Sequence, residues 1–97
     1  MEYALVTGGS RGIGKAICLR LADMGYNIIL NYTSNDEEAN KTKDLLAAKG
    51  VDVVLMKFDV SSTEESDANI ETWINTNKDK TITVLVNNAG IRKDNIM

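Results

Sequence analysis

Hydrophobic and polar positions alternate along the chain in blocks that predict strands and helices in turn. Four short apolar runs bounded by glycine or polar residues are typical of buried strands; they cover residues 3–7, 27–32, 51–58 and 81–86. The segments between them carry apolar residues at helical spacing, which predicts helices over residues 13–24, over 34–50 and from 62 onward. Strands that alternate with helices predict an α/β fold with a parallel sheet and right-handed connections.

Local signals mark the helix ends and the residues that face the core. Gly25 follows the first helix, and Ser34-x-x-Glu37 and Ser62-x-x-Glu65 match the capping box that opens a helix. Along the first helix, the apolar positions at helical spacing are Ile13, Ala16, Ile17, Leu21 and Met24. Along the third they are Ile70, Trp73 and Ile74, and we expect Trp73 and Cys18 to be core residues.

Composition excludes several classes of function. A chain of 97 residues fits one small domain, and its net charge of −3 offers no basic field for nucleic acid or an anionic membrane. No apolar run approaches the length of a membrane span. The single cysteine forbids an internal disulfide and fits a reducing, cytoplasmic location. Histidine is absent, which excludes Ser-His-Asp and Cys-His nucleophile systems and His-Glu-x-x-His zinc sites, so we expect no metal site.

The most informative stretch is LVTGGSRGIGKA, residues 5–16, where glycines follow an apolar run. It has three interpretations: the phosphate loop of a nucleotide hydrolase, a dinucleotide-binding loop, or a glycine-rich turn that binds nothing. A phosphate loop needs a serine or threonine after its Gly-Lys pair, because that hydroxyl helps to hold magnesium. Ala16 stands at this position, which argues against the first interpretation.

The glycine spacing fits a dinucleotide loop better. Between a predicted strand and a predicted helix the chain reads Thr7-Gly8-x-x-x-Gly12-x-Gly14. Gly8 allows a sharp turn off the strand, Gly12 permits close approach of a pyrophosphate, and Gly14 lets the helix pack tightly on the sheet. The helix N-terminus then offers free N–H groups and a partial positive charge to the phosphates.

Two motifs together resemble the short-chain dehydrogenase/reductase family. TGGSRGIG, residues 7–14, resembles its cofactor loop, and NNAG, residues 87–90, resembles its second signature, with Asp59-Val60 closing the third strand between them. The resemblance covers the whole chain and implies a Rossmann-type three-layer α/β fold with strand order 3-2-1-4. Within the family, residues 88–95 (NAGIRKDN) are most similar to the 3-oxoacyl-(acyl-carrier-protein) reductases, which typically read NAGITRDN there.

The resemblance implies an NADP(H) site at the strand ends. The glycine loop would line the phosphates, Asp59 would accept a hydrogen bond from the adenine amino group, and Asn88 would border the ribose and nicotinamide. Arg11, and the lack of a carboxylate at the tip of the second strand, favour NADPH over NADH. The implied cofactor-binding residues are Gly8, Gly9, Ser10, Arg11, Gly12, Ile13, Gly14, Tyr32, Thr33, Ser34, Asp59, Val60, Asn88, Ala89 and Gly90.

The catalytic residues of the family do not have counterparts in this chain. The resemblance implies that these catalytic residues are a Ser, a Tyr-x-x-x-Lys pair and a further Asn, all downstream of the Asn-Asn-Ala-Gly motif. The residues four positions after Tyr3, Tyr26 and Tyr32 are a threonine, a leucine and an aspartate, so no catalytic residue is assigned. We therefore expect residues 1–97 to be the N-terminal, cofactor-binding part of a single Rossmann-fold domain, truncated before the catalytic half and inactive alone.

The expected intact protein is an NADPH-dependent 3-oxoacyl-(acyl-carrier-protein) reductase of fatty acid synthesis, which reduces the 3-keto group of a carrier-protein thioester to 3-hydroxy. The alternatives are acetoacetyl-CoA reductase or another short-chain reductase, and a non-catalytic half-domain that binds a nucleotide. The fourth strand, with ITVLV at residues 82–86, has no successor to pair with its outer edge. Because an apolar edge is a template for pairing with another copy, we expect a homo-oligomer.

Overall fold

Strands and helices alternate along the chain as the hydrophobic pattern predicts. The structure, a computed structural model, describes residues 2–9 and 12–88. In chain order the elements are β1 (Glu2–Val6), α1 (Gly12–Asp23), β2 (Asn27–Tyr32), α2 (Asp36–Ala47), β3 (Val53–Lys57), α3 (Thr63–Thr76) and β4 (Thr81–Val86). The bounds of β2 and β4 match the prediction, and the others differ by a few residues at their ends. None of these described helices is long and apolar enough to cross a membrane.

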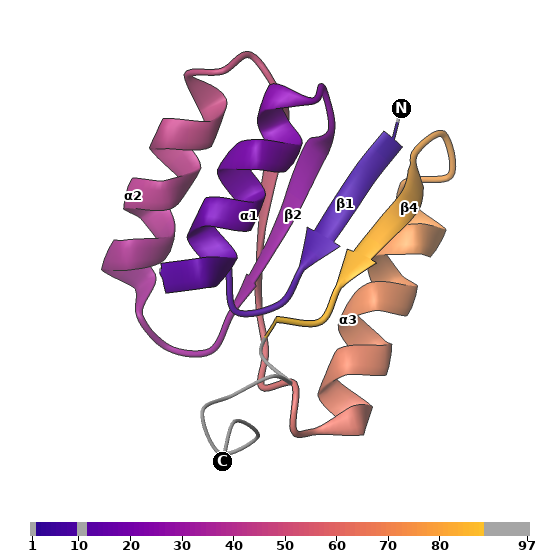
Figure 1. Cartoon of the computed structure of the whole chain (residues 1–97). Coiled ribbons are helices and arrows are strands. Elements are labelled where there is room, and N and C mark those ends of the chain that lie inside the picture. The colour runs from indigo at the N-terminus through magenta and orange to yellow at the C-terminus, as the bar shows by residue number, and fades with distance from the viewer. Residues whose placement is uncertain (1, 10–11, 89–97) are drawn as a thin grey trace.

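The described strands form one parallel sheet with the order β3-β2-β1-β4, which confirms the predicted topology. Helices α1 and α2 cover one face of the sheet and α3 covers the other, so the fold has three layers (Figure 1). Because all four strands run the same way, their carboxyl ends meet at one edge, the lower edge in Figure 1. The loops that follow the strands therefore gather there.

The core is divided by the sheet into two clusters. On the side of α1 and α2, Val6 and Leu30 pack with the buried thiol of Cys18. On the side of α3, Leu5 packs with Trp73, whose ring meets Tyr3 edge-to-face at 5.1 Å between centroids. Cys18 and Trp73 are thus core residues, as predicted. Each fully buried side chain of this size contributes about 1.5–3 kcal/mol, so β1, buried on both faces, holds the turn that follows it firmly.

The apolar stripe predicted along α1 faces the core only in part. Ile17 and Leu21 pack against the core cluster, but Ile13 and Met24 at the two ends of the stripe are 68% and 64% exposed. In α3, Ile74 is 47% exposed. The residues of α1 that are buried are small and spaced by four: Gly14, Cys18 and Ala22. Residues at this spacing lie one above the other on a helix face. Small side chains there bring α1 close to the sheet and to the turn after β1.

The helix caps follow the prediction at α3 but not at α2. Ser62 caps α3 by accepting a hydrogen bond from the Glu65 amide at 3.3 Å. At α2 the cap is Asn35 rather than the predicted Ser34, and its side chain accepts from the Glu38 amide at 3.0 Å. Asparagine and serine are similarly good caps, so two such neighbours leave the start of a helix undecided by one residue.

Candidate cofactor site

The glycine turn between β1 and α1 lies at the carboxyl edge of the sheet. The order of the strands in the sheet reverses direction at this point. From β1 the chain adds β2 and then β3 on one side, and it then crosses over to add β4 on the other side of β1 (Figure 1). In open α/β sheets, ligands bind outside the carboxyl ends of the strands at such a reversal. The loops after β1, β2, β3 and β4, which carry the predicted site residues, all reach this edge.

The glycines of this turn are required by its backbone. Gly8 and Gly12 have φ angles of 65° and 64°, in the left-handed region that side chains disfavour. Gly14 has an ordinary φ, but a Cβ added to it would lie 2.1 Å from the Gly8 carbonyl oxygen and 2.7 Å from the Asn88 side-chain nitrogen. The turn therefore folds back onto the first turn of α1 and leaves no room for a side chain at position 14.

Two asparagines hold the turn from either side. The buried Asn31 at the end of β2 accepts a hydrogen bond from the Gly8 amide through its side chain, at 3.2 Å, and one from the Gly9 amide through its carbonyl, at 3.0 Å. From the other side, the Asn88 side chain donates to the Gly8 carbonyl at 3.2 Å. The Thr7 hydroxyl adds a link to the Asn87 side chain at 3.3 Å. Residues 7–9 of the turn are thereby tied to β2 on one side and to the residues after β4 on the other.

Asn31 is a residue that the sequence analysis did not assign. Its side chain also donates to the carbonyls of Met56 and Phe58, at 3.2 and 3.0 Å, so it joins the ends of β1, β2 and β3. The signal that points to it is a polar residue in the otherwise apolar run NIILNY, in a strand that is buried along most of its length. A buried amide must find partners, and partners at a strand end lie in the neighbouring loops.

The N-terminus of α1 is electrostatically open to an anion. Its first turn contains no acidic residue, whereas α2 begins with Asp36, Glu37 and Glu38, and α3 begins with Glu64 and Glu65. Carboxylates in the first turn normally balance the partial positive charge of a helix N-terminus. At α2 and α3 the protein supplies that charge itself. At α1 a glycine turn precedes the helix and no carboxylate balances this charge, so an external phosphate group can do so.

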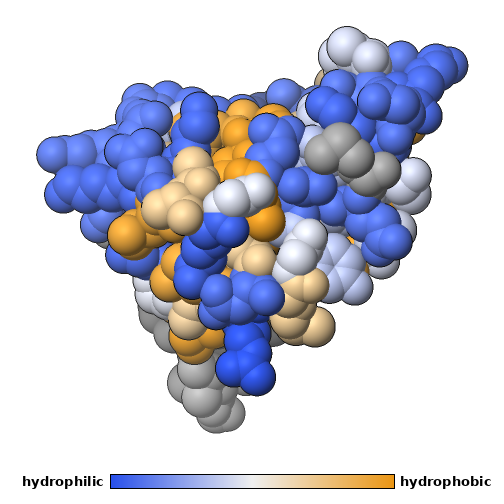
Figure 2. Space-filling model, turned by 90° about the horizontal axis from the view of Figure 1, so that it is seen from above, coloured by the Kyte–Doolittle hydropathy of each residue, from blue (hydrophilic) through white to orange (hydrophobic). Residues whose placement is uncertain are grey.

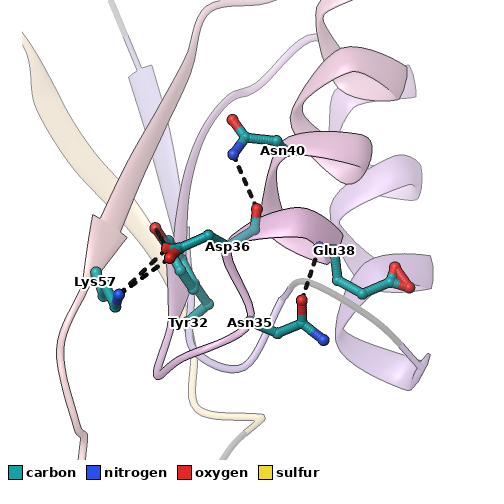
Figure 3. Close-up of polar contacts among 6 residues, drawn as sticks. All are labelled: Tyr32, Asn35, Asp36, Glu38, Asn40 and Lys57. Carbon is teal, nitrogen blue, oxygen red and sulfur yellow. Dashed lines mark hydrogen bonds and ion pairs between the residues drawn. The ribbon is translucent and has the colours of Figure 1, made fainter.

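Where β2 leads into α2, the carboxylate of Asp36 is bound by neighbouring side chains of the protein (Figure 3). The Tyr32 hydroxyl donates to the Asp36 carboxylate at 2.7 Å, and the Lys57 ammonium lies 3.3 Å from the same group. The bond from Tyr32, helped by Lys57, lowers the pKa of Asp36, and the same bond raises the pKa of Tyr32. The hydroxyl of Tyr32 is thus committed to α2, while Thr33 and Ser34 beside it are exposed.

After β3, Asp59 and Val60 form the turn that leads into α3. The Asp59 carboxylate accepts from the amide and the hydroxyl of Ser61, at 2.9 and 2.7 Å, and Val60 packs partly against the core cluster on the α3 side. Asp59 is exposed at the carboxyl edge. The structure therefore gives Asp59 a role in the turn, and its contact with adenine stays a prediction.

Four of the predicted site residues, Ser10, Arg11, Ala89 and Gly90, lie outside the described residues. Of the others, the structure brings Gly8, Gly14 and Asn88 into one contact group and leaves the Ile13 side chain exposed at the start of α1. An open hollow also exists at the opposite, amino edge of the sheet. Figure 2 looks onto that end, where hydrophilic and hydrophobic residues mix. The hollow is lined by Glu2, Met24, Gly25, Tyr26 and Asn27, none of them a predicted cofactor residue.

Comparisons with known proteins agree with this geometry. The short chain dehydrogenase family model matches residues 2–97. The chain is 43% identical over 96 residues to the 3-oxoacyl-[acyl-carrier-protein] reductase FabG of Staphylococcus aureus (strain MW2), covering 99% of this chain and 38% of that protein. It is 43% identical over 90 residues to the L-rhamnose 1-dehydrogenase (NADP(+)) of Thermoplasma acidophilum, covering 93% of this chain and 35% of that protein.

Among solved structures, the chain resembles the acetoin dehydrogenase YohF of Salmonella typhimurium. The TM-score is 0.79 at 34% identity, over 91% of this chain and 36% of that structure. The chain thus spans little more than a third of the length of the curated relatives it matches, 38% in the case of FabG. The family match nevertheless extends over residues 2–97, through both glycine-containing motifs. The chain belongs to the short-chain dehydrogenase family.

Proposed function

We propose that the protein containing this chain is an NADPH-dependent 3-oxoacyl-(acyl-carrier-protein) reductase of fatty acid synthesis, in which residues 1–97 form the N-terminal, cofactor-binding part of one Rossmann-fold domain. The observation that carries the proposal is the glycine turn fixed by Asn31 and Asn88 at the acid-free N-terminus of α1. The names of the Staphylococcus relatives, and the sequence NAGIRKDN at residues 88–95, support this substrate class over a sugar.

The residues of the chain that would contact the cofactor lie in the loops after all four described strands. When bound, the nicotinamide supplies the hydride that reduces a ketone. The glycine turn and the N-terminus of α1 bind the pyrophosphate through N–H groups, with Ser10 and Arg11 beside them. The other contacts belong to the loops after β2, β3 and β4: Tyr32, Thr33, Ser34, Asp59, Val60, Asn88, Ala89 and Gly90.

The same proposal covers substrate, assembly and location. The substrate is an acyl-carrier-protein thioester, in line with the names of the relatives. For this chain alone, homo-oligomers are expected because β4 lies at an edge of the described sheet and its Leu85 is exposed. A cytoplasmic location agrees with a single, buried, unpaired cysteine.

NADPH is expected to bind this chain more tightly than NADH. The carboxylate nearest the end of β2, Asp36, is paired with the Lys57 ammonium, which offsets its charge towards a 2′-phosphate. Arg11 adds a positive charge, and a charge-assisted contact of this kind contributes about 1.5–3 kcal/mol, or roughly 10- to 100-fold in affinity. Calorimetric titration with NADPH, NADH and ATP measures the difference. The name of the Thermoplasma relative supports the same choice.

Arg11→Ala is the matched variant for this experiment. It should weaken NADPH alone and so narrow the gap between the two cofactors. Equal affinities in the unmodified chain, or an equal loss for both cofactors in the variant, would show that the 2′-phosphate is not recognised by this loop. Tight binding of ATP with no binding of either cofactor would instead favour a nucleotide-binding module.

This chain alone should show no reductase turnover. The family transfers a proton from a tyrosine whose pKa is lowered by a lysine four residues later, and none of the three tyrosines has such a lysine. A steady-state assay with NADPH and acetoacetyl-CoA tests this expectation. Turnover near ordinary enzyme rates, about 1 per second, would mean that another group in the chain donates the proton.

A further inference from the structure

The side chain of Asn31 bonds to both loops that the proposed function assigns to the ADP part of the cofactor. Its oxygen accepts from the Gly8 amide in the glycine turn at 3.2 Å. Its nitrogen donates to the carbonyls of Met56 and Phe58, at 3.2 and 3.0 Å. Phe58 immediately precedes Asp59, the residue proposed to meet the adenine. One amide thus spans the phosphate-binding and adenine-binding loops.

The surroundings of Asn31 make these bonds specific. The residue is 1% exposed, so water cannot replace a missing partner at low cost. An amide is required because the site needs an acceptor on one atom and a donor on the other. A carboxylate could serve the Gly8 amide but not the two carbonyls, and an apolar side chain could serve none of them.

We propose that Asn31 is a positioning residue for the cofactor site: its side chain couples the glycine turn to the loop after β3, so that phosphates and adenine meet loops already set relative to each other. This inference rests on the proposed function. Preformed loops raise affinity because the ligand does not have to order them on binding. Asn31 itself need not touch the cofactor.

The same strand offers a matched control in Asn27. It lies at the opposite end of β2, where its side chain donates to the Glu2 carbonyl at 3.2 Å and accepts from the Asp52 amide at 2.8 Å. Asn27 therefore links the same three strands at the edge away from the proposed site. The variants remove amide bonds of the same kind, three at the buried Asn31 and two at the more exposed Asn27, and only the variant of Asn31 should affect the cofactor.

The first test compares Asn31→Leu with Asn27→Leu in the 97-residue chain. Titration with NADP⁺ should show about 10-fold weaker binding for Asn31→Leu, the equivalent of roughly one lost hydrogen bond of preorganisation, and less than about 2-fold for Asn27→Leu. Thermal unfolding of both variants shows whether the losses of stability are comparable. An equal change of NADP⁺ affinity in the two variants would mean that Asn31 only stabilises the fold, and it would overturn the proposal.

The second test uses Asn31→Asp, which keeps the acceptor for Gly8. The introduced carboxyl faces two carbonyls in a buried site, so its pKa should rise, and its protonated form can again donate one bond. NADP⁺ affinity of this variant should therefore recover as the pH falls from 8 to 5.5. The unmodified chain and Asn27→Asp should show no such recovery. A flat profile for Asn31→Asp would contradict the coupling.

Amide hydrogen exchange separates a failure of this inference from a failure of the proposed function. In Asn31→Leu the Gly8 amide loses its partner and should exchange about 10-fold faster. The Gly9 amide, which bonds to the backbone of residue 31 at 3.0 Å, should change little. If the unmodified chain binds no NADP⁺, the proposed function fails. Unchanged Gly8 exchange in the variant, whatever the binding result, overturns the role of the Asn31 side chain.

Discussion

Gly14→Ala is expected to abolish cofactor binding and to destabilise the chain by roughly 2–3 kcal/mol, the usual cost of overpacking. Alanine in a helix is intrinsically favoured over glycine by about 1 kcal/mol, so the loss must come from contacts. The added Cβ would lie 2.1 Å from the Gly8 carbonyl oxygen, a backbone atom that cannot rotate away. The turn would have to leave α1, and with it the bonds from Asn31 and Asn88. Urea unfolding and titration with NADPH measure the two effects.

Two other glycines provide controls for the loss of stability, and one of them, Gly50, also provides a control for cofactor binding. Gly12 has a φ of 64° and Gly50 one of 89°, and a Cβ on either would meet no atom within 4 Å. Alanine at these positions should cost only the left-handed backbone strain of about 1–2 kcal/mol. Gly50→Ala lies far from the proposed site and should leave NADPH affinity unchanged. If Gly14→Ala binds NADPH as the unmodified chain does, the turn is not the phosphate site.

The order of strands and helices along the chain was predictable because these elements differ clearly in pattern, whereas the order of the strands in the sheet was implied by the family resemblance. NIILNY and TITVLV are short apolar runs with polar neighbours, and β2 and β4 begin and end where those runs do. The buried face of α1 was only partly predictable from hydrophobicity. Ile13 and Met24 fit a helical stripe, but the sheet selects the neighbouring stripe of small residues around Cys18, because a close approach is possible only there.

Part of the candidate site was predictable for a similar reason. Gly14 and Asn88 belong to motifs whose spacing reflects a backbone requirement, and the structure brings both to Gly8. Asn31 belongs to no motif of this kind. Its side chain bonds to backbone groups of Gly8 and Phe58, and because every residue type has a backbone carbonyl, these partners impose no pattern on the sequence. Residues that bond to the main chain of distant loops leave only a weak sequence signal, a polar residue within a buried strand.

Alkaline solution is expected to remove about 4 kcal/mol of stability through Cys18. Burial raises the pKa of its thiol from 9.0 to about 12, because the thiolate would lose its hydration. A raised folded-state pKa means that this contribution is fully present below pH 9, where the thiol is protonated in both states. It is lost as the pH rises from 9 to about 12, because the unfolded chain ionises first. Urea unfolding at pH values from 8 to 11 should show about 3 kcal/mol of this decline, because the series covers two of the three pH units.

Cys18→Ala separates this thiol from Tyr3 and Tyr32, two buried tyrosines whose pKa values are also raised. Burial, with a hydrogen bond to Asp52, raises the pKa of Tyr3 from 10.0 to about 12, so its contribution begins to fall one pH unit later. The variant should therefore be flat between pH 9 and 10 and decline only above that range. An identical pH profile for the two proteins would mean that the thiol is not held in its neutral form by the fold.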